Sequence, residues 1–149
     1  KGLSLNRRVI KDFAQELIKE YDVKTPHYNI PVKNLSGGNQ QKVVVGREIA
    51  KNPKLLLVMQ PTWGLDVGAC EFVYKKILEE REKGVAVLLI STELEEVRSL
   101  SDRLAVLYEG QIMGEVDPKV TSVEEIGLMM AGARRDDDVI TEKEVLKPV

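Results

Sequence analysis

The stretch LSGGNQQK, residues 35–42, holds the residues best suited to bind an anion. Ser36 is of a type favoured at the start of a helix, and Gly37 and Gly38 let a backbone approach a ligand closely. The exposed N–H groups and the dipole at a helix N-terminus favour anions, phosphate above all. An ordinary Ser-Gly-Gly turn before a helix is the other interpretation, and the glycines alone do not decide between the two.

A second stretch, LLLVMQPTWGLD at residues 55–66, ends an apolar run at a sharp turn. Five apolar residues lead to Gln60, and the chain then turns at Pro61 and Gly64. A run of this kind places functional residues at the edge of a sheet. Here the delivered residues are Met59 and Gln60, and neither carries a charge.

Composition narrows the classes of protein that these stretches can serve. The chain has 149 residues, of which 43% are hydrophobic and 31% charged, which suits one soluble globular unit. Its net charge of −2 argues against nucleic acid or an anionic membrane surface as a partner. Cys70 is the only cysteine, so an internal disulfide or a cysteine zinc site is excluded, and we expect Cys70 to be buried or half-buried. Since the chain begins with Lys1 and not Met, we expect it to be a piece of a longer protein.

Hydrophobic periodicity predicts the elements around the first stretch. Apolar side chains recur at helical spacing over 7–21, and residues 22–36, which hold three turn-forming residues, indicate a loop. A second helix is expected to begin near Gly38 and to end near Asn52, just before a proline.

The rest of the chain alternates strands and helices. Short apolar runs at 55–59 and 85–90 suit strands that are covered on both faces, and the helical segment 68–83 between them implies a parallel βαβ crossover. A short helix is expected at 94–101. The segment after it alternates and turns at Glu109-Gly110, which predicts a hairpin.

The C-terminal part is predicted to hold one more helix and then a tail. Residues 122–130 indicate a helix that is capped by Thr121 or Ser122, with acidic residues in its first turn. The charged and polar tail, 133–149, has little to bury, so we expect it to be disordered or ordered by a partner.

Four motifs in register resemble the ATP-binding-cassette (ABC) ATPases. LSGGNQQK resembles the signature motif of that family, LLLVMQPT the Walker B strand, GLD at 64–66 the D-loop, and LLISTELEEV the switch strand and loop. SDRLAVLYEGQIMGE resembles the closing hairpin, so the resemblance covers residues 7–132. DVKTP, GLDVGA and EEIGLMMAG resemble the second cassette of a tandem ATPase for uptake of simple sugars or nucleosides, and Gln60 with IGLMMAG favours the nucleoside branch.

The resemblance implies an α/β, P-loop NTPase-like fold of which one part is absent. No G-x-x-x-x-G-K-[ST] occurs, so the Walker A region that holds nucleotide phosphates is missing. We expect a helical-subdomain remnant over 1–53, an α/β core portion with a partial, mainly parallel sheet and a C-terminal hairpin plus helix over 54–132, and the flexible tail. Apolar edges of such a sheet would be exposed, which favours a homo-oligomer of the chain.

By this resemblance, the nucleotide site of the chain's own cassette is degenerate. Met59 stands where the family has an Asp that helps hold Mg²⁺, and a thioether is the wrong ligand for that ion, so we expect Met59 only to pack. Gln60 stands where the family has the Glu that polarises water; an amide cannot take the proton, although it can orient a water. Glu93 replaces the switch histidine and would repel the γ-phosphate, and His27 does not substitute for it. No intact catalytic residue and no metal site is therefore expected.

The same resemblance implies that the half-site lent to a partner is intact. In ABC ATPases two cassettes pair head to tail, so the signature and D-loop of one close over the ATP that the other holds. The residues implied to bind that ATP in trans are Leu35, Ser36, Gly37, Gly38, Asn39, Gln40, Gly64, Leu65 and Asp66. Trp63 is expected either at the contact between cassettes or in plain packing.

The implied function is part of an ATPase that powers membrane import of a small solute. ATP and Mg²⁺ would serve the full assembly, with neither tightly bound to this chain alone. The implied partners are a second cassette, transmembrane permease subunits and, indirectly, a solute-binding protein, at the cytoplasmic face of the membrane. Two alternatives stay open: a soluble ABC protein of DNA repair or translation, disfavoured because residues 1–34 lack a heptad run and the chain is not basic, and a non-catalytic module whose tail docks a regulator.

Overall fold

The computed structural model describes residues 5–133, which form two compact units that divide between Ile90 and Ser91. Each unit is described in turn. The predicted division at 53/54 concerns the subdomains of a larger cassette and stays a prediction. The predicted tail, 133–149, lies outside the described residues apart from Ala133.

Three helices and a loop make up most of the first unit. They are α1 (Arg7–Glu20), α2 (Gly37–Ile49) and α3 (Val67–Glu82), with a short 3-10 turn, η1 (Val32–Asn34), in the loop before α2. All three lie within a turn of their predicted bounds, since apolar periodicity and a capping residue determine each of them.

A small core joins α1 to α2 and α3. Leu17, Tyr21 and Ile49 are buried together, and the ring of Phe72 on α3 packs edge-on against Tyr21, with 6.1 Å between ring centroids. Gly46 lets α2 approach α1 closely, because a Cβ at this position would lie 3.0 Å from the Tyr21 ring. This packing fixes the position of α2, whose first turn carries the signature motif.

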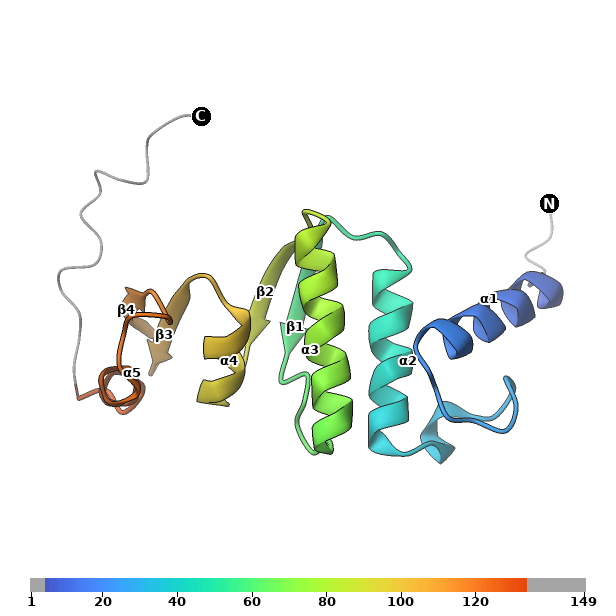
Figure 1. Cartoon of the computed structure of the whole chain (residues 1–149), viewed down its shortest axis with the longest axis horizontal. Helices are drawn as coiled ribbons and strands as arrows, with labels where there is room; N and C mark the ends of the chain where they lie inside the picture. The colour runs from blue at the N-terminus through green and yellow to red at the C-terminus, as the bar shows by residue number, and fades with distance from the viewer. Residues whose placement is uncertain (1–4, 134–149) are drawn as a thin grey trace. The chain divides into compact units, whose positions relative to one another are not determined.

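The two strands of the first unit pair as predicted. β1 (Leu55–Met59) and β2 (Ala86–Ile90) are parallel, with Leu57 opposite Leu88, and α3 is the crossover between them (Figure 1). The strand–helix–strand order therefore gives the parallel βαβ unit that the sequence predicts.

The expectation that both strands are covered on both faces is wrong for the described residues. Half-buried residues alternate with exposed ones along each strand, and Leu55, Leu57 and Met59 are 58%, 63% and 72% exposed. Leu88 and Ile90 line the same face of β2 and are 53% and 45% exposed. Because successive side chains of a strand point to opposite faces, α3 covers one face of this pair and leaves the other uncovered.

The second unit is a hairpin between two helices. Its elements are α4 (Leu94–Leu100), β3 (Leu104–Tyr108), β4 (Gln111–Val116) and α5 (Val123–Met130), and the strands pair antiparallel. The predicted turn is confirmed: Glu109 and Gly110 both have positive φ, 47° and 79°, as a two-residue hairpin turn requires.

The core of the second unit lies between the hairpin and α5. Val106 and Met113 from the strands are buried against Ile126 and Met129 from the helix. The predicted helix start is also confirmed, because the hydroxyl of Ser122 accepts a hydrogen bond of 3.2 Å from the Glu125 N–H.

Candidate functional site

The signature motif forms the first turn of α2. Ser36 is the N-cap residue, and its carbonyl oxygen accepts the first helical hydrogen bond, 2.9 Å from the Gln40 N–H. The Gln40 side chain reaches back and donates a hydrogen bond of 2.8 Å to the Leu35 carbonyl. The helix start is thus held by side chains of the motif itself.

The hydroxyl of Ser36 does not cap the helix backbone. It accepts a hydrogen bond of 2.8 Å from the side-chain Nδ2 of Asn39, one turn along the helix. The side-chain oxygen of Asn39 in turn accepts a bond of 2.7 Å from the backbone N–H of Lys24, which lies in the loop after α1. The signature is therefore tied to a loop that precedes it by more than ten residues, a contact that the sequence pattern does not reveal.

The D-loop forms the turn into α3. Leu65 donates a backbone hydrogen bond of 3.0 Å to the Thr62 carbonyl, and Gly64 adopts a positive φ of 73°. Asp66 is the N-cap of α3, where its Oδ1 accepts a hydrogen bond of 2.9 Å from the Ala69 N–H. The structure thus gives Asp66 a local role, as helix cap, in addition to the one implied by the resemblance.

The structure brings the signature and the D-loop together. A Cβ built on Gly38 would lie 3.0 Å from the Ala69 Cβ and 3.8 Å from an Asp66 carboxylate oxygen, and one on Gly37 would lie 3.8 Å from the Leu65 side chain. α2 and α3 run side by side and begin at the same end (Figure 1). The N-terminus of α2, whose N–H groups carry positive partial charge and favour an anion, is therefore adjacent to the start of α3, which the Asp66 carboxylate already caps.

The end of β1 carries no carboxylate. Met59 is 72% exposed on the uncovered face of the sheet, so the expectation that it packs is wrong within the described residues. Gln60 extends the ladder by donating its backbone N–H to the Ile90 carbonyl at 2.8 Å, and it has a φ of 47°, which is uncommon for a residue other than glycine. Thioether and amide side chains at this strand end do not match the oxygen-rich, charged ligand set of Mg²⁺.

Glu93 and Trp63 lie at exposed positions. Glu93 belongs to the second unit, where it is the N-cap residue of α4 and donates its backbone N–H to the Ser91 hydroxyl at 3.0 Å. Trp63, in the turn before the D-loop, is 81% exposed, which is incompatible with plain packing inside the first unit. Its alternative role at a contact between cassettes stays a prediction. Cys70 is half-buried, as expected.

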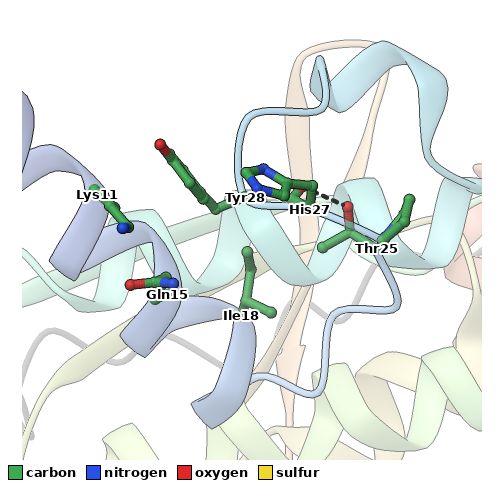
Figure 2. A pocket seen from close by; sticks show the side chains of 7 residues that line it. Lys11, Gln15, Ile18, Thr25, His27 and Tyr28 are labelled. Atoms are coloured by element: carbon green, nitrogen blue, oxygen red, sulfur yellow. Dashed lines mark hydrogen bonds between the residues drawn. The ribbon is translucent and has the colours of Figure 1, made fainter.

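An open pocket of about 370 Å³ lies between α1 and the loop that follows it. The ring of His27 lies against that of Tyr28, tilted by 35° and with 4.6 Å between centroids, and Thr25 donates a hydrogen bond of 3.0 Å to the His27 carbonyl (Figure 2). The residues that line the pocket are Lys11, Gln15, Ile18, Thr25, Pro26, His27 and Tyr28. Sequence reasoning missed this pocket, and the adjacent His-Tyr pair was the available signal. Across residues 5–133, no three His, Cys, Asp or Glu side chains gather closely enough to hold a metal ion.

Two lysines lie over the aromatic rings that join the helices. The Lys42 ammonium lies 4.7 Å from the centroid of Phe72, and that of Lys76 lies 5.1 Å from the centroid of Tyr21. Burial of the phenol, together with the nearby acidic side chains of Glu20, Glu80 and Glu79, raises the pKa of Tyr21 to about 12.

Comparison with known proteins gives a consistent set of relatives. No protein family model matches the chain. The chain is 56% identical over 124 residues to the guanosine import ATP-binding protein NupO of Bacillus subtilis. It is 48% identical over 128 residues to the nucleoside import ATP-binding protein NupA of Lactococcus lactis subsp. cremoris. It is also 43% identical over 116 residues to the ribose import ATP-binding protein RbsA of Oceanobacillus iheyensis. These matches include 83%, 86% and 78% of this chain, respectively. They include 24%, 25% and 23% of the relatives, so the chain spans about a quarter of the length of the curated proteins that it matches.

A solved structure supports the same relationship at the level of the fold. The dimeric post-hydrolysis state of the ATP-binding cassette MJ0796, bound to ADP and Pi, superposes with a TM-score of 0.65 at 27% identity. The match includes 77% of this chain and 50% of the MJ0796 chain. Within the described residues, the helices are too short or too polar to cross a membrane.

Proposed function

The chain is a homologue of the ATP-binding proteins of ABC import systems, and from this relationship we propose that it forms part of the ATPase that powers import of a nucleoside or sugar. The identity is higher to the guanosine and nucleoside import proteins than to the ribose import protein, which favours a nucleoside. The observation that carries the proposal is the adjacency of the signature and the D-loop at the N-termini of α2 and α3.

The half-site that the chain lends to a partner cassette is the functional one in this proposal. ATP fits it: Ser36 offers a hydroxyl, Gly37 and Gly38 offer N–H groups, and the N-terminus of α2 supplies positive potential. The triphosphate itself would be held by the P-loop of the partner cassette, and Asp66 would reach across the contact. Asn39 donates to the Ser36 hydroxyl and Gln40 to the Leu35 carbonyl, while Gly64 and Leu65 form the turn that leads to Asp66.

The chain's own half-site is the degenerate one. Because Met59 and Gln60 supply no carboxylate, the residues at the end of β1 fit neither a tightly held Mg²⁺ nor a general base. Glu93 would place a negative charge where the family has a histidine beside the γ-phosphate. We infer that one of the two ATP sites of the assembled transporter turns over slowly or not at all.

The partners follow from the same proposal. A second cassette, on the same polypeptide or on another, provides the P-loop that faces the signature of this chain. Transmembrane permease subunits carry the solute, and a solute-binding protein delivers it from outside. The cassette pair then works at the cytoplasmic face of the membrane.

Assays on the isolated chain test whether it lacks a working nucleotide site of its own. We expect the purified 149-residue chain to show no saturable ATP turnover and no tight binding of Mg-ATP, because its described residues supply neither a P-loop nor a metal ligand at β1. Turnover is measured by phosphate release and binding by calorimetry. Saturable turnover by the pure chain would refute the degenerate assignment.

Substitutions in the transporter ATPase that contains this chain test whether its two half-sites differ in activity. Ser36→Ala is expected to lower total turnover on the order of 100-fold, the usual effect of removing one donor that stabilises charge in the transition state. Gln60→Ala is expected to change turnover little, since Gln60 belongs to the degenerate half-site. Equal losses at both positions would contradict the proposal.

A further inference from the structure

We propose that Asn39 is a positioning residue for the Ser36 hydroxyl, and that the backbone of the loop after α1 sets the orientation of its amide. The inference rests on the proposed function, in which that hydroxyl faces the ATP of a partner cassette. It adds a connection that neither the signature motif nor the comparisons contain, from Lys24 through Asn39 to Ser36.

The Lys24 backbone determines which way the Asn39 amide points. A backbone N–H only donates, so the Asn39 atom that lies 2.7 Å from the Lys24 nitrogen must be the acceptor, Oδ1. The NH₂ group then points to the other side, where it lies 2.8 Å from the Ser36 Oγ and donates to it. A flipped amide would lose the bond to Lys24, because two donors would face each other there, and it would turn its oxygen toward the Ser36 hydroxyl, which would then donate to Asn39.

This orientation leaves the proton of the Ser36 hydroxyl available. A hydroxyl has one hydrogen and accepts through its lone pairs, so Ser36, which accepts from Asn39, keeps its own hydrogen to donate elsewhere. The hydroxyl is not used to cap the helix backbone either. A hydroxyl that already accepts one hydrogen bond is polarised and is a better donor to an anionic oxygen.

The loop that carries Lys24 is held firmly to the helices on either side. Val23, which precedes it, is 4% exposed and donates its N–H to the Ile18 carbonyl of α1 at 3.0 Å. The Lys42 ammonium on α2 donates a bond of 3.1 Å to the Asp22 carbonyl. The C-terminal end of α1 and the signature hydroxyl are therefore linked by a short chain of fixed contacts, and a shift of that end would misalign the hydroxyl.

The competing interpretation is that Asn39 only stabilises the helix start. The two interpretations predict different activities when loss of the Asn39 side chain is combined with loss of the Ser36 hydroxyl. A positioning residue has nothing to position once the hydroxyl is gone, so the effects of Asn39→Ala and Ser36→Ala should not add; a purely structural residue would lower activity in both backgrounds.

The experiment is a double-mutant cycle in the transporter ATPase that contains this chain. Asn39→Ala is expected to lower turnover by roughly tenfold in the native background and less than twofold in the Ser36→Ala background. In Asn39→Asp, the carboxylate still accepts a hydrogen bond from the Lys24 N–H, but it also accepts one from the Ser36 hydroxyl. The hydroxyl then has no hydrogen left to donate to ATP, so this variant should lower turnover at least as much as Asn39→Ala. Asn29→Ala, which removes an asparagine elsewhere in the loop, should leave turnover unchanged. Additive losses at Asn39 and Ser36, or an active Asn39→Asp variant, would overturn the inference.

Amide hydrogen exchange in the 149-residue chain tests the contact without any ATPase activity. The Lys24 N–H is expected to be protected in the native chain and in Asn39→Asp and Asn29→Ala, and to exchange at least tenfold faster in Asn39→Ala. Equal protection in the native chain and Asn39→Ala would overturn the inference. If Ser36→Ala left turnover of the transporter unchanged, the proposed function would fail, while the exchange measurement would still report on the Lys24–Asn39 bond.

Discussion

At the scale of single residues, the two half-sites of the proposed function differ in the hydrogen bonds that hold their side chains. Ser36 and Asp66 each have a defined hydrogen-bond partner one turn along their helices, in Asn39 and in the Ala69 N–H. At the end of β1, Met59 is mostly exposed and Gln60 occupies an uncommon backbone conformation. Hydrogen bonds within the fold thus hold the side chains of the signature and the D-loop, whereas Met59 and Gln60 present no carboxylate at the end of β1.

The two glycines of the signature give a matched pair of variants at this scale. A Cβ on Gly38 would lie 3.0 Å from the Ala69 Cβ, so Gly38→Ala must push α2 away from α3, at a cost of about 1–3 kcal/mol in the free energy of unfolding. A Cβ on Gly37 would meet its nearest neighbour at an ordinary 3.8 Å, so Gly37→Ala should leave the free energy of unfolding within about 0.5 kcal/mol of native.

Urea denaturation of the 149-residue chain and its two variants measures the difference. Only Gly38→Ala should shift the unfolding midpoint markedly downward, and only this variant should loosen the contact between the signature and the D-loop. Equal midpoints for the two variants would show that α2 and α3 are not as close at Ala69 as the structure has them.

At the scale of elements, α1, α2 and α3 are joined through Tyr21 and Phe72 and the two lysines above them. Lys76 is held in place by a hydrogen bond of 2.8 Å to Glu79, which also holds the pKa of that carboxyl below its usual value. This cluster places aromatic faces under cations that are largely shielded from water, where such contacts are strongest. It keeps α2 in register with α3, and so keeps the signature beside the D-loop.

The raised pKa of Tyr21 predicts how this packing responds to alkali. Below pH 10 the Tyr21 phenol is protonated in both the folded and the unfolded chain, so its contribution to the free energy of unfolding is fully present. Between pH 10 and about 12 the unfolded chain loses the proton while the folded chain keeps it, so the free energy of unfolding should fall by roughly 2–3 kcal/mol.

Tyr21→Phe isolates this effect from the lysines that titrate in the same range. The variant keeps the ring contacts but has no ionisable phenol, so its free energy of unfolding should fall less steeply with pH than that of the native chain. Chemical denaturation at a series of pH values from 9 to 12 gives both curves. Parallel curves would mean that Tyr21 ionises at its ordinary pKa in the folded chain.

The sequence predicts the elements well because their signals are local. Helical spacing from Ile10 to Tyr21, the caps and the Glu109-Gly110 turn each act within a few residues, and the structure confirms them. Coverage of β1 was predicted wrongly, because an apolar run shows that a strand can be covered and not what covers it. The bond from Asn39 to Lys24 joins positions fifteen apart with no pattern between them, so only the fold reveals it.

At the scale of the whole molecule, the sheet of the first unit has an exposed apolar face that favours association with another chain. Five large apolar side chains of β1 and β2 lie in register on one face, each between 45% and 72% exposed. The pair has only two strands, which is marginal for an isolated sheet, and within residues 5–90 both outer strand edges are unpaired. The match to the solved cassette MJ0796 includes 50% of that chain.

When the 149-residue chain is alone, we expect a second copy to cover this face. Sedimentation velocity over a hundredfold range of concentration should show reversible association, driven by removal of these side chains from water. Leu57→Lys places a charge at the centre of the face, where Leu57 is 63% exposed, and should weaken association at least tenfold without unfolding the chain. Val120→Lys is the matched control, since Val120 is 81% exposed in a loop of the second unit, away from both strands in sequence. Equal weakening by the two substitutions would show that general apolar exposure, and not the β1–β2 face, holds the copies together.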